Sequence, residues 1–101
     1  MVEQPLIQPE HNCQLAAFLG QQPGPIKIRG KEYRLDNIRR EGDLGFFADA
    51  HTSRAKLIAM QTPSKVIGRP GAESWAIMRL TGKGAIVANF AIWNSRVIEL
   101  A

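Results

Sequence analysis

His11 and Cys13 are the first residues in this chain whose types could bind a metal ion. They stand two apart in a segment that we expect to be helical, and positions i and i+2 do not share a helical face. The single cysteine has no second Cys or His cluster to complete a ligand set. We therefore predict no metal site, and we expect Cys13 to be a small, partly buried helix residue.

Asp49, His51 and Ser53 could be drawn as an acid–base pair or as a catalytic triad. Residues i and i+2 on a strand point the same way, whereas a triad needs its base held between the nucleophile and the orienting carboxylate. All three residue types also suit the end of a strand and the following turn. We favour ordinary turn chemistry and do not expect an enzyme.

The stretch Thr81-Gly82-Lys83-Gly84 is similar to part of a phosphate-binding loop. It lacks the glycine that stands four residues earlier in such loops, and a strand is expected after it, where a phosphate loop needs a helix N-terminus. We interpret it as a hairpin turn and predict no cofactor.

A glycine followed by two phenylalanines, at positions 45–47, resembles the strand with which cold-shock domains and related proteins stack single-stranded bases. The match covers only these few residues, and the flanking residue is the acidic Asp43 instead of a basic one. Phe is among the most buried residue types. We therefore favour core positions for Phe46 and Phe47, on opposite faces of one strand.

Basic side chains are the best-supported functional candidates in the sequence. They occur on one predicted hairpin, directly after it, and in the longest irregular segment, residues 62–73. If the hairpin and this loop are adjacent, the basic residues form a positive groove that could contact phosphates. The alternative is a solvated outer face whose charges discourage aggregation at a sheet edge. The candidate nucleic-acid-binding residues are Lys27, Arg29, Lys31, Arg34, Arg39, Arg40, Lys65 and Arg69.

The elements that must position these groups belong to one domain, because 101 residues can bury a single core but not two. The net charge of +4 favours polyanionic partners, although small domains also carry such a charge for solubility. One cysteine allows no intrachain disulfide, and neither a signal peptide nor a membrane-spanning run of apolar residues is recognisable. We expect a cytoplasmic protein with no membrane partner.

The pattern predicts a mainly β fold: a small antiparallel β-barrel or a strongly bent sheet of six or seven strands, with one short N-terminal helix. Within the single domain 1–101, residues 1–8 are expected to be extended, 9–20 helical, and 25–101 an antiparallel meander. The expected strands are 26–29, 32–38, 44–50, 55–61, 74–80, 85–93 and 96–100.

Register can be predicted for two parts of the meander. A turn at Gly30-Lys31 would pair Ile28 with Tyr33 and Arg29 with Glu32, which separates an apolar face from a basic one. In the C-terminal sheet, turns at 82–83 and 94–95 would pair Arg79 with Ile86, Ile77 with Ala88, Trp75 with Phe90 and Trp93 with Arg96.

Both faces of the C-terminal sheet are apolar in that register, so both must be covered. We expect either a closed barrel with the helix outside or an interface with a second copy. The candidate interface residues are Trp93, Arg96, Ile98 and Leu100.

Two functions follow from the sequence as hypotheses. The first is nucleic-acid binding through the basic hairpin face. The second is a protein-interaction module, an inhibitor or adaptor, that could form a homodimer through the apolar C-terminal sheet.

Overall fold

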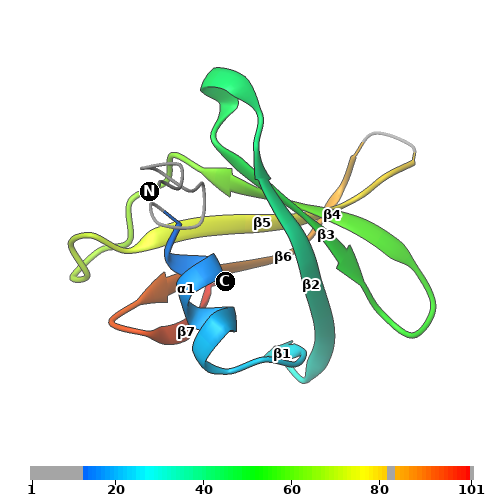
Figure 1. Ribbon diagram of the computed structural model, residues 1–101, viewed down its shortest axis with the longest axis horizontal. Helices are drawn as coiled ribbons and strands as arrows, with labels where there is room; N and C mark the ends of the chain where they lie inside the picture. Colours follow the sequence, from blue (N-terminus) through cyan, green and yellow to red (C-terminus); the bar gives the residue numbers. More distant parts are fainter. Residues whose placement is uncertain (1–12, 82–83, 101) are drawn as a thin grey trace, which may run out of the picture.

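The protein folds into seven antiparallel strands that follow one another in sequence order and curl into a nearly closed barrel (Figure 1). The computed structural model describes residues 13–81 and 84–100. The mainly β fold with one short helix, predicted from the alternating pattern, is confirmed. The elements are α1 (Gln14–Gln21), β1 (Ile26–Ile28), β2 (Lys31–Arg40), a 3-10 turn (Gly42–Leu44), β3 (Phe46–His51), β4 (Lys56–Thr62), β5 (Glu73–Arg79), β6 (Ile86–Trp93) and β7 (Arg96–Leu100).

The core fills the inside of the barrel, because alternate residues of each strand point inward. Trp75 and Phe90 face each other across β5 and β6, with ring centroids 6.3 Å apart and an angle of 11° between the rings. On β3 and β4 the inward residues include Ala48, Ala50 and Ala59, each fully buried. These small side chains leave room for the large rings from the opposite side of the barrel.

The helix packs on the sheet through its apolar side. Leu15 and Phe18 are buried in the same core as Trp75. Cys13, whose backbone is extended, precedes the first turn, so α1 starts later than the predicted 9–20 helix. The predicted segments 1–8 and 9–12, with His11, lie outside the described residues.

A buried carboxylate on β5 caps the helix. Glu73, which is 6% exposed, accepts hydrogen bonds from the backbone N–H groups of Gln14 and Leu15, both at 2.9 Å. It also accepts one from Trp75 Nε1 at 2.8 Å. The Cys13 thiol lies 3.8 Å from the same carboxylate, and burial, followed by the nearby Glu73, raises the pKa of this thiol to about 11. The strand therefore supplies the N-cap that the helix sequence lacks.

The first hairpin differs from its predicted register. The turn is Arg29-Gly30, with φ of +53° and +83°, and Ile28 pairs with Lys31 while Ile26 pairs with Tyr33. A two-residue turn with positive φ at both positions matches the twist of the strands, and Gly suits its second position. Because the error is a slip of two residues, the predicted faces are still correct.

In the C-terminal sheet the predicted pairs Trp75–Phe90, Ile77–Ala88 and Trp93–Arg96 are confirmed. The predicted pair Arg79–Ile86 is wrong, because a β-bulge shifts the register so that Ile86 lies opposite Met78. The predicted turn residues Gly82 and Lys83 lie outside the described residues. A bulge changes the direction of the side chains that follow it. Here the register shift lies between Ile77 and Met78, directly before Arg79.

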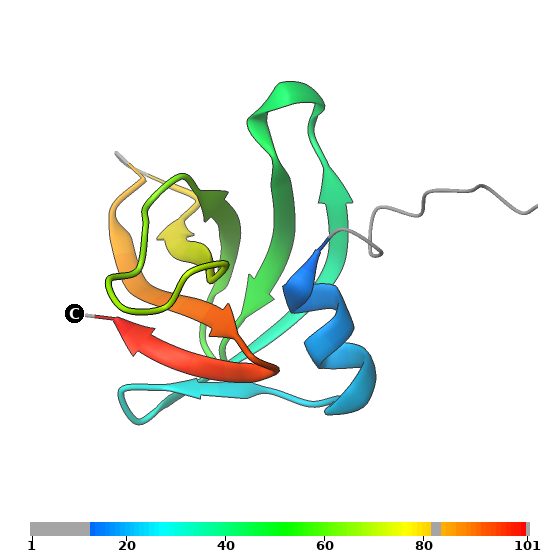
Figure 2. The same ribbon diagram turned by 90° about the vertical axis from the view of Figure 1, so that its left-hand side faces the viewer.

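The second face of this sheet is covered in part by the loop between β4 and β5, which folds back toward β6 (Figure 2). Ser74 Oγ donates to the carbonyl oxygen of Ser64 at 3.0 Å, and Ala91 beside it is fully buried. Beyond the loop, Ile98 and Leu100 on β7 remain half-buried. The chain thus covers one end of this face by itself, without the helix.

Candidate nucleic-acid interface

A groove lies at one end of the barrel, where the β1–β2 turn, the β3–β4 turn and the end of β5 meet. Its volume is about 980 Å³. Its lining holds a single carboxylate, Glu32, and one half-buried histidine, His51. We call it the basic groove, after its cationic lining residues Lys31, Arg34, Arg54, Lys56 and Arg79.

Cross-strand pairing brings these cations together from three strands. Arg34 lies opposite His51, and His51 lies opposite Lys56, so the three form one row across β2, β3 and β4. Neighbouring strands are about 4.8 Å apart, which places the ends of this row about 10 Å from each other. Arg79 pairs with the buried Leu57, so it lies on the other face of the sheet from Lys56 and reaches the groove at the end of the barrel. The fold therefore presents fixed, closely spaced positive charge.

The charge of the protein is concentrated in this groove. Its five cationic side chains and one carboxylate give a formal charge of +4, with His51 neutral. The whole chain of 101 residues also has a formal charge of +4, from 13 basic and 9 acidic residues. The eight basic and eight acidic residues outside the groove therefore balance. A groove of one sign focuses the field and attracts a polyanion.

Two of the eight sequence candidates, Lys31 and Arg34, line the basic groove. Arg29 is in the adjacent turn, not on the strand as predicted, and Lys27 is an exposed residue of β1. The hairpin thus supplies two of the cationic lining residues of the basic groove.

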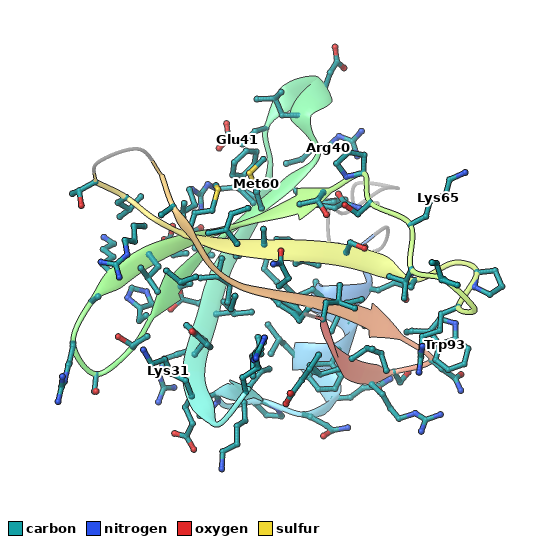
Figure 3. The ribbon with its side chains drawn as sticks, turned by 180° about the vertical axis from the view of Figure 1, so that it is seen from behind. Lys31, Arg40, Glu41, Met60, Lys65 and Trp93 are labelled. Carbon is teal, nitrogen blue, oxygen red and sulfur yellow. The ribbon has the colours of Figure 1, made fainter. Side chains whose placement is uncertain are left out.

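Arg39 and Arg40 lie at the other end of β2, away from the basic groove (Figures 1 and 3). Arg39 forms ion pairs with Asp49 at 3.0 Å and with Glu41 at 3.2 Å. Hydrogen bonds from the Asn37 amide and from Arg39 hold the pKa of Asp49 below its usual value. The Arg40 guanidinium lies over the ring of Phe46, 5.4 Å from its centroid.

Lys65 lies on the other side of the molecule from Lys31 (Figure 3), and Arg69 belongs to the same loop as Lys65. They line a second pocket formed by the loop between β4 and β5, which contains no residue of the hairpin. The adjacency of hairpin and loop that a single long groove would require is therefore absent from the described structure.

His51, Arg54, Lys56 and Arg79 were not among the predicted nucleic-acid-binding residues. His51 was considered for catalysis, Arg54 and Lys56 belong to a segment interpreted as a turn and a strand start, and Arg79 was given an incorrect partner on β6. The order of the strands would have allowed this row to be predicted. A turn at 52–55 places Lys56 opposite His51, and the pairing of β2 with β3 places His51 opposite Arg34. Because these charges are far apart in sequence, their proximity can be predicted only when the registers of both strand pairs, β2–β3 and β3–β4, are known.

The residues considered for catalysis are engaged in other contacts. His51 Nε2 lies 3.5 Å from Asp36 on the neighbouring strand, while Asp49 is held by Asn37 and Arg39. Ser53 is an exposed residue of the β3–β4 turn. Among residues 13–81 and 84–100, no three His, Cys, Asp or Glu side chains are grouped as a metal site would need.

A scan against protein-family models, a search of curated proteins and a search of solved structures each found no match to this chain. Within the described residues, no helix has the length and apolar character required to cross a membrane.

Proposed function

We propose that this protein binds nucleic acid through the basic groove. The observation that carries the proposal is the concentration of charge: the groove holds a formal charge equal to that of the entire chain. Lys and Arg side chains at such spacing neutralise phosphates and release counterions, which supplies most of sequence-independent affinity. Arg34 and Lys56 lie in one cross-strand row and are both exposed, so they are available to a ligand.

The aromatic residues favour contact with the phosphate backbone over stacking on bases. Single-stranded binders present exposed rings as stacking platforms. Here five of the seven aromatic side chains are buried, including Tyr33, which lies at the groove. Phe47 is half-buried on another part of the sheet, and Trp93 is covered by two guanidinium groups. We therefore propose a duplex, whose phosphates are displayed along its surface, as the preferred ligand.

Fluorescence anisotropy tests the proposal, with labelled single-stranded and double-stranded oligonucleotides titrated at several salt concentrations. With up to five phosphate contacts in a duplex, log K against log salt should have a slope of up to about −4.5. The variant Arg34→Gln/Lys56→Gln should weaken duplex binding at least tenfold at low salt and reduce the slope by about 2.

The matched control is Arg40→Gln/Lys65→Gln, which removes the same two charge types from outside the basic groove. It should keep nearly the wild-type affinity. Equal losses in both variants would mean that only net charge matters, which contradicts the proposal. No binding of either oligonucleotide at low salt would also refute it. Tighter binding of the single strand would refute the preference for a duplex.

A protein-interaction module is the second candidate function. It is supported by Ile98 and Leu100, apolar residues that stay half-buried on β7, a strand at the edge of the sheet. An edge strand with apolar neighbours can pair with another chain. Light scattering tests the homodimer version, which predicts twice the mass of one chain and the single mass for Ile98→Lys. A single mass for the wild type at high concentration would remove it.

A further inference from the structure

A second cationic cluster occurs where β6 ends, centred on an indole ring. The Arg69 guanidinium lies 5.6 Å from the ring centroid of Trp93, and that of Arg96 lies 6.0 Å from it. Arg96 is positioned as the cross-strand partner of Trp93, and Arg69 comes from the loop between β4 and β5. We call these three residues the arginine–tryptophan cluster.

The loop that carries Arg69 is fixed at several points. Trp93 Nε1 donates to the carbonyl oxygen of Pro70 at 3.3 Å, and Gln14 Nε2 donates to that of Gly71 at 2.6 Å. The backbone N–H of Arg69 closes a turn on the carbonyl oxygen of Val66. These bonds fix the loop backbone at and after Arg69, which reduces the entropy lost on binding.

Both guanidinium groups lack acidic partners among the described residues, where the ion pairs involve Arg39 and His51 instead. The Arg69 Nε atom is buried and has no hydrogen-bond acceptor in the described part of the chain. Because this atom is buried, an anion would bind through the terminal N–H groups of Arg69, whose charge is not balanced by an ion pair in the described residues. The guanidinium fork matches the oxygens of a phosphate group, and stacking on an aromatic face leaves its edge donors available.

We propose that the arginine–tryptophan cluster is a second phosphate-binding site, so that one molecule holds two separate segments of nucleic acid. This inference rests on the proposed function of the basic groove. Figure 3 places Lys31 and Trp93 on different sides of the molecule. Lys65 belongs to the same loop but points away from Trp93, so it lies outside the cluster.

The test uses a nucleic-acid hairpin that is short enough to occupy one site at a time. A hairpin duplex of eight base pairs is about 27 Å long, because each base pair adds about 3.4 Å. It is shorter than the 44 Å length of the molecule, so each hairpin should occupy one site. Sedimentation or calorimetric titration of the full chain at low salt should give two hairpins for each chain. Arg69→Gln/Arg96→Gln should bind one hairpin, through the groove. Arg34→Gln/Lys56→Gln should also bind one, through the cluster.

Binding at the cluster should quench the fluorescence of Trp93 in the groove variant, and Trp93→Phe should abolish this signal. The control Arg40→Gln/Lys65→Gln should still bind two hairpins. If the wild-type chain binds only one hairpin and the groove variant binds none, the second site is overturned, whereas the proposed function of the groove is supported. No binding at all would overturn both. Circular dichroism melts of each variant separate lost binding from lost folding.

Discussion

Replacement of Glu73 by Gln tests whether the buried carboxylate stabilises the fold through its hydrogen bonds. Glu73 Oε1 accepts from Leu15 N–H and Trp75 Nε1, and Oε2 accepts from Gln14 N–H. A glutamine carbonyl can accept the first two bonds, but its NH₂ group then faces the Gln14 N–H, donor against donor.

The magnitude follows from these three bonds. Leaving one buried donor unpaired costs about 1–3 kcal/mol, and each of the other two bonds loses about 1 kcal/mol when the acceptor is no longer charged. Removing a buried charge gives back part of its desolvation cost. We expect Glu73→Gln to lower the free energy of unfolding by about 3 kcal/mol, which corresponds to a fall in Tm of roughly 15 °C. A domain of this size still folds after such a loss.

Urea denaturation followed by circular dichroism measures the change, with Glu99→Gln as the control. Glu99 is an exposed carboxylate on β7, so this substitution should change stability by less than about 0.5 kcal/mol. An unchanged or increased stability of Glu73→Gln would refute the reasoning, because desolvation of the carboxylate would then outweigh its hydrogen bonds.

Two further substitutions test other features of the fold. The Cys13 thiol has its pKa raised from 9.0 to about 11, so its stabilising contribution is complete below pH 9 and is lost as the pH rises to 11. Between pH 8 and pH 10.5 the wild type should lose about 2 kcal/mol more than Cys13→Ala in urea titrations, and equal losses would contradict burial of the thiol. Gly45 has φ of +96°, and a Cβ there would lie 3.1 Å from Gln61 Oε1. Gly45→Ala should therefore cost about 2 kcal/mol, whereas Gly20→Ala in the open helix should be neutral or stabilising; a neutral Gly45→Ala would show that this backbone tolerates a side chain.

The barrel could be predicted from the sequence because the alternation of apolar and polar residues shows which side chains share a face of a strand. This information does not depend on the exact residues that form each turn. The faces of Ile26, Ile28, Tyr33 and Leu35 were correct even though the hairpin register was not. What the pattern could not show was a turn with positive φ at Arg29, since Gly30 alone fits several turn positions.

The site was predicted less completely than the fold. Groups on one hairpin, such as Lys31 and Arg34, were found because their neighbours in sequence are their neighbours in space. Arg79 was missed because the pairing of β5 with β4 was not predicted, and the predicted pairing with β6 is changed by a bulge that no local pattern indicates. The separation of Arg69 from the hairpin depends on how far the sheet curls, and that is a property of all seven strands together.

The meander topology has a consequence for the order of folding. Every strand pair joins neighbours along the chain, so each hairpin can form early at a low cost in loop-closure entropy. The contacts between Glu73 and α1 instead join residues 58–60 positions apart. We expect these contacts to form only when most of the sheet is in place, so that the helix docks late in folding. Loss of the Glu73 contacts should then speed unfolding and change the folding rate little.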